Sequence, residues 1–171
     1  MTSESQAERP APTGLVVGRF DPPHLGHSYL IEAAAAQCDQ LVVFVNSGGA
    51  DAAPGELRAQ WLAELHPTVI VRLVRHSLKT DFGDETLWAQ WMALFRGHWP
   101  LPEGPHLVLS SDPYVDELAR RFGATPVVVD AERLTVPISA TMIRADPARH
   151  LDRLAPPVRA WVEETWLGGG G

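Results

Sequence analysis

Short, continuous runs of apolar residues recur along the chain, and longer segments of mixed polar and apolar residues separate them. Such runs are typical of strands that are buried on both faces of a parallel sheet. The runs that predict strands cover residues 15–17, 41–45, 68–74, 106–109 and 125–129. The segments rich in helix formers predict helices over residues 28–37, 56–65, 86–96 and 113–123, and over 156–166. The last of these is amphipathic, and we expect it to pack on the sheet.

The alternation of strands and helices predicts βαβ units, and therefore an α/β fold with a doubly wound parallel sheet in a single domain. We place the domain at residues 14–167, between a disordered lead-in over residues 1–13 and a flexible glycine tail over residues 168–171. Asp112 and Pro113 follow the fourth predicted strand, and this pair predicts that Asp112 caps the next helix.

The composition argues against nucleic-acid-binding, membrane-spanning and secreted classes of protein. The formal net charge of the 171 residues is −7, so we do not expect a general nucleic-acid-binding protein. No apolar run approaches the ~20 residues that span a bilayer, and the polar N-terminal segment does not resemble a secretory signal. The single cysteine, Cys38, excludes an intrachain disulfide, which suits a cytoplasmic protein. Cys38 falls near the end of the first predicted helix, where we expect a packed or partly exposed thiol.

The segment between the first strand and the first helix concentrates candidate chemistry. Residues 18–27 are Gly-Arg-Phe-Asp-Pro-Pro-His-Leu-Gly-His. His24 and His27 are three residues apart at the opening of a helix, so both imidazoles can point to one side. Free backbone N–H groups and the helix dipole favour an anion there, and Gly26 lets a phosphate approach the backbone. The segment therefore predicts a phosphate site, whereas either histidine alone is more simply explained as a cap or a surface residue.

A second segment of this kind begins the helix after the fifth strand. Residues 138–144 are Ile-Ser-Ala-Thr-Met-Ile-Arg. Ser139 is a natural N-cap, Thr141 lies in the first turn and Arg144 lies one turn further on. Hydroxyls, free amides and a guanidinium at one helix start suit a polyphosphate. On these residues alone, a capped helix with a surface arginine is the simpler interpretation.

Together the two segments resemble the signatures of a known superfamily. Residues 24–27 match the H-x-G-H motif of the nucleotidyltransferases, and residues 18–22 match the G-[RKT]-F-x-P pattern that precedes it. Residues 138–144 match the second signature of the superfamily, I-S-x-T-x-x-R, at the expected distance. Within the superfamily the chain resembles nicotinamide mononucleotide (NMN) adenylyltransferases, in particular the adenylyltransferase domain of bifunctional adenylyltransferase/ribosylnicotinamide kinase proteins. The resemblance extends over residues 14–162.

The resemblance implies a Rossmann-like nucleotidyltransferase fold and an enzyme that transfers AMP from ATP to NMN or nicotinic acid mononucleotide, releasing pyrophosphate. The catalytic residues that it implies are Arg19, His24, His27 and Arg144. The nucleotide-binding residues that it implies are Gly18, Phe20, Gly26, Ser139 and Thr141, together with Arg144. It also implies Mg²⁺ that bridges phosphate oxygens and has few protein ligands of its own. Asp21 either caps its turn or assists this ion indirectly.

The acceptor side is marked by weaker signals, and the residues that we assign to it are Asn46, Arg58, Trp88 and Arg133. Asn46 follows a strand, where loops of α/β sheets hold ligands. Arg58 resembles an arginine in the same helix of relatives, and a solvated helix charge is an equal alternative. Trp88 lies where relatives carry a tryptophan beside the nicotinamide ring, although a tryptophan at helical spacing is more often a core residue, as we expect for Trp91. Arg133 completes an Asp-x-x-Arg stretch that resembles one in relatives.

Two other functions compete with this interpretation. One is a cytidylyltransferase, or an adenylyltransferase for another phosphorylated small molecule, because the signatures do not define the acceptor. The other is a nucleotide-binding sensor without turnover, against which the intact signature residues argue. The sequence contains no G-x-x-x-x-G-K-[ST] motif, so we expect no P-loop kinase site. We expect ATP and a phosphorylated small molecule as partners, and a homo-oligomer is compatible with the sequence.

Overall fold

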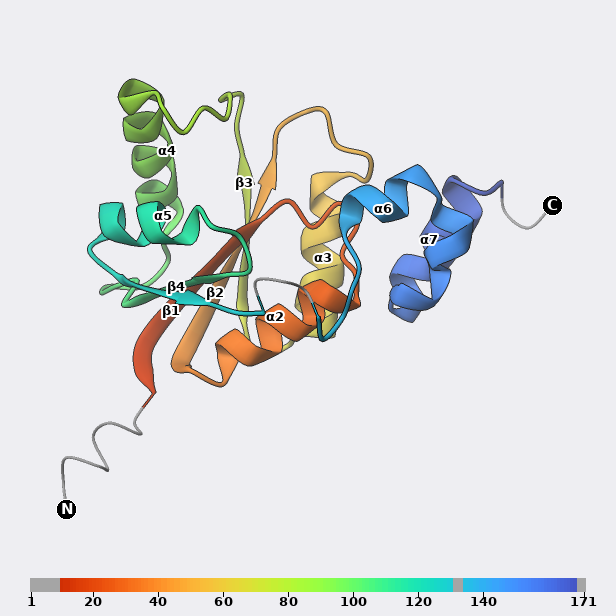
Figure 1. Ribbon diagram of the computed structural model, residues 1–171, viewed down its shortest axis with the longest axis horizontal. Coiled ribbons are helices and arrows are strands. Elements are labelled where there is room, and N and C mark those ends of the chain that lie inside the picture. The colour runs from red at the N-terminus through yellow and green to blue at the C-terminus, as the bar shows by residue number, and fades with distance from the viewer. Residues whose placement is uncertain (1–9, 131–133, 169–171) are drawn as a thin grey trace, which may run out of the picture.

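The computed structural model describes residues 10–168 except residues 131–133. Within this part of the chain, five strands form one parallel sheet in the order β3-β2-β1-β4-β5 (Figure 1). The strands are β1 (Ala11–Gly18), β2 (Cys38–Ser47), β3 (Ile70–Arg75), β4 (Leu107–Ser110) and β5 (Thr125–Val128). The helices are α2 (Leu25–Ala35), α3 (Gly55–Leu65), α4 (Glu85–His98), α5 (Val115–Phe122), α6 (Ala140–Ala145), the 3-10 helix η1 (Pro147–Arg153) and α7 (Pro156–Thr165). The predicted doubly wound parallel sheet is therefore confirmed.

The strand order reverses between β1 and β4, which are neighbours in the sheet. The chain moves outward from β1 through β2 to β3, and then returns to the other side of β1. In open α/β sheets, ligands bind in the crevice outside the carboxyl ends of the strands at such a switch point. The fold thus directs attention to the loops that follow β1, β2 and β4.

Alternate residues of each central strand enter two separate cores, which explains why the strands read as continuous apolar runs. Leu15 and Val17 of β1 pack with α4 and α5 on one face of the sheet. Val16 of β1 packs with α2 and α3 on the other face. Figure 1 shows these two pairs of helices on opposite sides of the strands. All three β1 side chains are buried.

The C-terminal helix α7 does not pack on the sheet, so this prediction is wrong. Its buried residues Val158 and Val162 belong to a third core, which contains Trp61 of α3 and Ile143 of α6 (Figure 1). The rings of Trp61 and Trp161 meet edge to face, with their centroids 5.5 Å apart. The amphipathic pattern identified the buried face of α7 but carried no information about its partner.

Three local predictions also differ from the structure. β1 begins at Ala11, inside the segment that we assigned to a lead-in, and Cys38 begins β2 rather than ending a helix. Asp112 does not cap α5, because a turn intervenes and Tyr114 occupies the N-cap position. The backbone carbonyl of Asp112 instead accepts from the N–H of Val115 at 3.2 Å. Residues 1–9 and 169–171 of the predicted ends lie outside the described residues.

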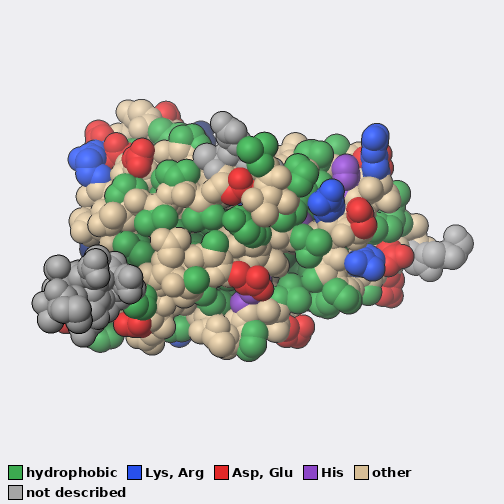
Figure 2. Space-filling view, turned by 60° about the horizontal axis from the view of Figure 1, so that its bottom comes forward, with side chains coloured by type: hydrophobic (Ala, Val, Ile, Leu, Met, Phe, Trp, Pro, Cys, Tyr) green, Lys and Arg blue, Asp and Glu red, His purple; other side chains and the backbone are tan. Residues whose placement is uncertain are grey.

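The surface agrees with the acidic composition. On the part of the face in Figure 2 that described residues form, the Lys and Arg side chains are scattered among Asp and Glu. None of the described helices is sufficiently long and apolar to traverse a bilayer.

Candidate active site

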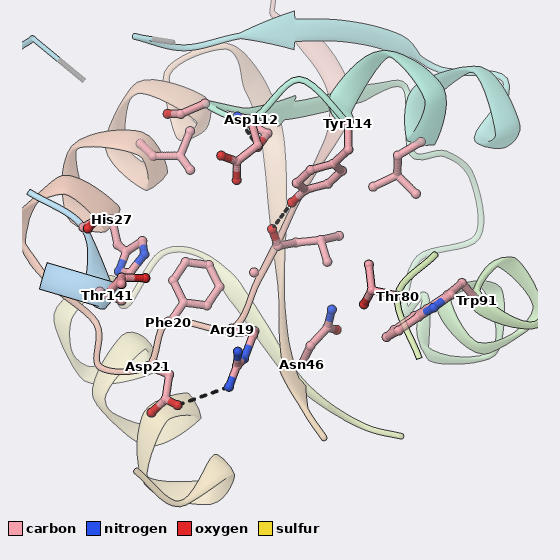
Figure 3. A pocket seen from close by; sticks show the side chains of 18 of the residues that line it. Arg19, Phe20, Asp21, His27, Asn46, Thr80, Trp91, Asp112, Tyr114 and Thr141 are labelled. Carbon is pink, nitrogen blue, oxygen red and sulfur yellow. Dashed lines mark hydrogen bonds and ion pairs between the residues drawn. The ribbon is translucent and has the colours of Figure 1, made fainter. Parts of the chain in front are cut away.

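A cavity of about 440 Å³ opens where the carboxyl ends of β1, β2 and β4 meet the starts of α2, α4 and α6 (Figure 3). Ten of the predicted site residues line it: Gly18, Arg19, Phe20, Gly26, His27, Asn46, Trp88, Ser139, Thr141 and Arg144. The two signature segments, more than a hundred residues apart in the sequence, thus share one cavity. His24 and Arg58 do not line it, and Arg133 lies outside the described residues.

His24 and His27 form a reciprocal cap at the start of α2. The Nδ1 atom of His24 accepts from the backbone N–H groups of Gly26 at 3.0 Å and His27 at 3.3 Å. The Nδ1 atom of His27 accepts from the backbone N–H of His24 at 3.1 Å. In the neutral rings the remaining proton therefore sits on Nε2, so that each imidazole offers an Nε2–H donor.

The two imidazoles lie face to face, with centroids 3.6 Å apart and planes 20° from parallel. His24 is only 2% exposed, whereas His27 lines the cavity (Figure 3). The ring of Phe20 meets the His27 imidazole edge to face, with centroids 4.8 Å apart, and this contact further restricts the orientation of His27. His27 is therefore the histidine that presents a donor to a ligand in the cavity, and His24 supports it.

The second signature is joined to the first by Arg144. Ser139 caps α6 as predicted, because its Oγ accepts from the N–H of Met142 at 3.2 Å. The guanidinium of Arg144 donates to the backbone carbonyl of Asp21 at 2.5 Å and to Thr141 Oγ1 at 3.3 Å. These bonds hold a cation and a hydroxyl at the wall of the cavity, where both suit phosphate oxygens.

Arg58 is wholly buried, so the alternative of a solvated helix charge is wrong. It ties together the loops that follow β1 and β2, through bonds to the backbone carbonyls of Arg19, Asn46 and Ala53 and to the carboxylate of Asp51. Burial lowers the pKa of Arg58, while the carboxylates of Asp51 and Asp21 act in the opposite direction. Arg58 thus holds the loops of the site in place, and its side chain does not line the cavity.

Two carboxylates complete this buried network. Asp21 is 1% exposed and accepts from the backbone N–H groups of Ala52 and Ala53, both at 2.8 Å. Burial alone would raise the pKa of Asp51, but the Ser47 hydroxyl and then the Arg58 guanidinium lower it below its usual value. Asp21 therefore fastens two loops to one another through both of its carboxylate oxygens.

Arg19 lies at the rim of this network with its side chain 55% exposed. Its guanidinium is 3.5 Å from the Asp21 carboxylate and 3.7 Å from that of Asp51 (Figure 3). Both distances are longer than a good hydrogen bond and the guanidinium itself is exposed, so it can exchange a carboxylate for a phosphate.

Both tryptophans of α4 line the cavity, although we predicted this for Trp88 alone. Trp88 lines the cavity but is 6% exposed, and the Arg121 guanidinium covers its ring at 4.5 Å from the centroid. Trp91, which we assigned to the core, is half-buried and also lines the cavity (Figure 3). The helical spacing of the two tryptophans could not show which indole has a covered face, because the covering guanidinium comes from Arg121, which is distant in the sequence.

The sequence interpretation missed the residues that the loops after β3 and β4 bring to the cavity. These are Thr80, Asp81, Phe82, Ser110, Ser111, Asp112 and Tyr114. Tyr114 donates its hydroxyl to the Val17 carbonyl at 2.8 Å, and burial raises the pKa of this phenol to about 12. The position of residues 110–112 directly after a strand, the same signal that selected Asn46, could have identified this group.

The described residues hold no group of three or more His, Cys, Asp or Glu side chains placed to bind a metal ion. Of the carboxylates that line the cavity, Asp112 faces into it (Figure 3). A Mg²⁺ ion that keeps most of its water and is held chiefly by substrate phosphates suits such a donor set, whereas a dedicated protein cage does not.

Comparisons with known proteins agree with this geometry. Residues 15–146 match the protein-family model described as cytidylyltransferase-like. The chain is 26% identical to the trifunctional NAD biosynthesis/regulator protein NadR of Salmonella typhimurium and 27% identical to that of Escherichia coli. Each of the two matches covers 89% of this chain and 41% of the relative, so the chain spans about two-fifths of the length of these proteins.

Solved structures share the fold. The crystal structure of NadR protein in complex with NAD and AMP-PNP superposes with a TM-score of 0.60 at 24% identity, over 83% of this chain and 44% of that one. A bifunctional NMN adenylyltransferase/ADP ribose pyrophosphatase from Francisella tularensis also gives a TM-score of 0.60, at 15% identity, over 86% and 44% of the two chains. A further structure of the Francisella protein is complexed with AMP and a manganese ion.

Proposed function

Because this chain belongs to the cytidylyltransferase-like family, we propose that it is a nucleotidyltransferase that transfers AMP from ATP to NMN. One observation carries the proposal. Residues of both signature segments line a single cavity, in which His27 and Thr141 lie at one end and the indole of Trp91 lies at the other (Figure 3). The arrangement suits two phosphorylated partners that meet in the middle, one of which carries a flat ring.

The reaction needs positioning and charge stabilisation more than a reactive side chain. An oxygen of the NMN phosphate attacks the α-phosphorus of ATP and forms a new phosphorus–oxygen bond. The bond between the α-phosphorus and the oxygen that bridges to the β-phosphate breaks, and pyrophosphate leaves with that oxygen. The Nε2–H of His27 donates to the α-phosphate oxygens as charge develops on them. His24 supports this donor through the reciprocal cap.

The leaving pyrophosphate is held by the second signature. Ser139 and Thr141 offer hydroxyls, and the Arg144 guanidinium offers a charge-assisted donor beside them. Arg19 also lines the cavity, where it exchanges its pairs with Asp21 and Asp51 for phosphate oxygens. A bound Mg²⁺ ion would supply further neutralisation of phosphate charge.

The flat ring of the acceptor occupies the aromatic end. Trp91 presents a half-buried indole there, and Asn46 reaches the same region from the end of β2 (Figure 3). The Oδ1 atom of Asn46 is buried and has no hydrogen-bond partner in the structure, so a polar substituent on the ring would satisfy it. The names of the NadR relatives refer to NAD biosynthesis, which supports a nicotinamide-type acceptor. Nicotinic acid mononucleotide, with the same ring and phosphate, is the related substrate to compare.

Tryptophan fluorescence distinguishes the two indoles. We expect saturating NMN to quench the fluorescence of wild type and Trp88→Phe, but considerably less that of Trp91→Phe, because Arg121 covers the Trp88 ring. Trp88→Phe also loses the bond from its indole N–H to the Phe82 carbonyl, so we expect a loss of about 1 kcal/mol in the free energy of unfolding. A quench that disappears in Trp88→Phe and persists in Trp91→Phe would reverse the assignment.

Arg144→Ala tests the grip on the nucleotide. Loss of a charge-assisted donor is worth roughly 1.5–3 kcal/mol, so the affinity for ATP should fall about 10- to 100-fold. Titration calorimetry with a non-hydrolysable ATP analogue measures this directly. The matched control is Arg149→Ala, which removes an exposed arginine that does not line the cavity. Equal affinities of the two variants would make Arg144 a structural residue.

A substrate screen tests the proposal as a whole. Pyrophosphate release is measured with ATP or CTP against NMN, nicotinic acid mononucleotide and 4′-phosphopantetheine. We expect turnover with ATP and a pyridine mononucleotide. Turnover with CTP, or with phosphopantetheine alone, would establish a nucleotidyltransferase with another substrate, and tight nucleotide binding without pyrophosphate release would establish a sensor.

A further inference from the structure

Trp91 lines the cavity, and a histidine that lies outside the cavity packs against its indole. The ring centroids of His76 and Trp91 are 4.4 Å apart, and their planes are inclined by 58°. The indole N–H donates to the Lys79 carbonyl at 2.9 Å, and the ring of Phe95 lies 5.4 Å from the indole on the same helix. His76 itself is half-buried and is not among the residues that line the cavity. It therefore supports a side chain of the site from outside the cavity.

His76 is held in place by groups from two loops. Its backbone N–H donates to the carbonyl of Ser47, the last residue of β2, at 3.1 Å. Its Nδ1 atom accepts from the N–H of Leu78 at 3.2 Å, so the neutral ring carries its proton on Nε2. The imidazole also lies against Gly48, where an added Cβ would be 3.0 Å from Cε1 and 3.1 Å from Nε2 of His76. The loops that follow β2 and β3 thus meet on one imidazole.

The same two segments contribute polar side chains to the site. Asn46 precedes Ser47, Thr80 follows Leu78 by two residues, and both Asn46 and Thr80 line the cavity (Figure 3). A ligand pays less conformational entropy to bind side chains that are already held in place than to order them on binding. Removal of the imidazole would take away one support of the Trp91 indole and the contact between the loops. A residue that does not line the cavity can thus change the affinity for a ligand inside it.

Protonation of His76 opposes this arrangement. A protonated Nδ1 atom is a donor, so it can no longer accept from the Leu78 N–H. Burial lowers the pKa of His76 below its usual value, while the Asp51 carboxylate and the Arg19 guanidinium act on it in opposite directions. The imidazole is therefore neutral near pH ~7 and becomes charged only under acidic conditions.

We propose that His76 is a positioning residue, which holds the Trp91 indole and the loops after β2 and β3 in the arrangement that binds the acceptor. The proposal rests on the proposed function, since that function places the ring of the acceptor beside Trp91. It assigns His76 an effect on the affinity for the acceptor, but not on the affinity for ATP or on the chemical step.

Steady-state kinetics with three variants test this role. His76→Ala should raise the KM for NMN about 3- to 10-fold and leave kcat and the KM for ATP within about twofold of wild type. His76→Phe keeps a ring against the indole and should restore most of the affinity for NMN. His76→Asn keeps only an acceptor for the Leu78 N–H and should resemble His76→Ala.

The matched control is His98→Ala. His98 is also half-buried and packs on an aromatic ring, that of Phe44 at 6.4 Å, but it does not line the cavity or contact a residue that does so in this way. We expect His98→Ala to leave both KM values unchanged. An unchanged KM for NMN in His76→Ala, or equal rises of both KM values, would overturn the proposal.

Acidification gives a readout that a merely structural role would not change. As the pH falls, the KM for NMN should rise more steeply in wild type than in His76→Phe, because the phosphate of NMN titrates equally with both proteins. Tryptophan fluorescence tests the contact without any substrate, since a protonated imidazole quenches an indole that it touches. The quench should be largest in wild type and smaller in both His76→Phe and Trp91→Phe.

The two readouts separate this proposal from the proposed function. Identical pH profiles of fluorescence in the three proteins would overturn the role of His76, whether or not NMN is a substrate. If wild type fails to turn over NMN but shows the quench that depends on His76 and Trp91, the proposed function fails, and the result supports His76 as the residue that positions Trp91.

Discussion

His27→Ala is expected to lower turnover at least ~100-fold, the scale of losing one preorganised donor to a transition state. The reason is geometric. His27 lines the cavity, and its Nδ1 atom accepts from the backbone N–H of His24. The Nε2–H is therefore the group of this imidazole that donates to the ligand. The fold and the affinity for ATP should survive, because His27 is partly exposed at the start of a helix whose other cap, His24, remains.

Two further substitutions separate donation from capping. His27→Asn places an amide oxygen near the position of Nδ1, so it retains an acceptor for the His24 N–H but has no group at Nε2. His27→Gln places an amide N–H nearer to Nε2 and should recover part of the turnover. His150→Ala, a histidine of η1 that does not line the cavity, serves as the control. Full activity of His27→Asn would show that the histidine only caps α2 and would refute the proposed role.

Arg58→Ala is expected to lower the free energy of unfolding by about 3–5 kcal/mol, the cost of breaking a buried ion pair from one side. The substitution would remove the Arg58 cation from the carboxylate of Asp51, whose side chain is 10% exposed, and the donor to the Arg19 and Asn46 carbonyls. Urea unfolding measures the loss. Arg72→Ala, which removes an exposed arginine of β3, should change stability by no more than about 0.5 kcal/mol.

A double variant identifies the cause of this loss. Arg58→Met with Asp51→Asn removes both charges and keeps much of the volume, so part of the stability should return. If the double variant is as unstable as Arg58→Ala, the lost backbone bonds rather than the unpaired carboxylate are responsible. A loss of less than about 1 kcal/mol in Arg58→Ala would contradict the view that Arg58 holds the two loops of the site together.

The sheet could be predicted from the sequence because burial on both faces leaves a direct trace in the chain. The run at 41–45 is apolar throughout since Val42 and Phe44 enter one core while Val43 and Val45 enter the other. The partner of α7 could not be predicted in this way. An amphipathic helix shows which face is buried, and the third core that receives this face includes residues of α3, about ninety residues earlier in the sequence, as well as of α6.

The residues of the candidate site likewise divide into those that the local sequence identified and those whose roles depend on distant residues. The signature residues were found because each segment carries its own chemistry at a local spacing, and Ser139 caps α6 as its residue type predicts. Arg58 escaped a correct interpretation because its partners lie in two other loops. Trp88 lines the cavity as predicted, but the local pattern did not show that Trp91 lines it too or that Arg121 of α5 covers one face of the Trp88 ring. Long-range packing, rather than local pattern, decided each of these cases.

The central claim is that both signatures meet in one cavity to transfer AMP to a pyridine mononucleotide. Incubation of the chain with NMN and ATP labelled at the α-phosphate tests it most directly. We predict that the label enters NAD in equal amounts with released pyrophosphate, and that His27→Ala abolishes most of this transfer. Label that remains in ATP, or that appears as free AMP without any dinucleotide, would contradict the account.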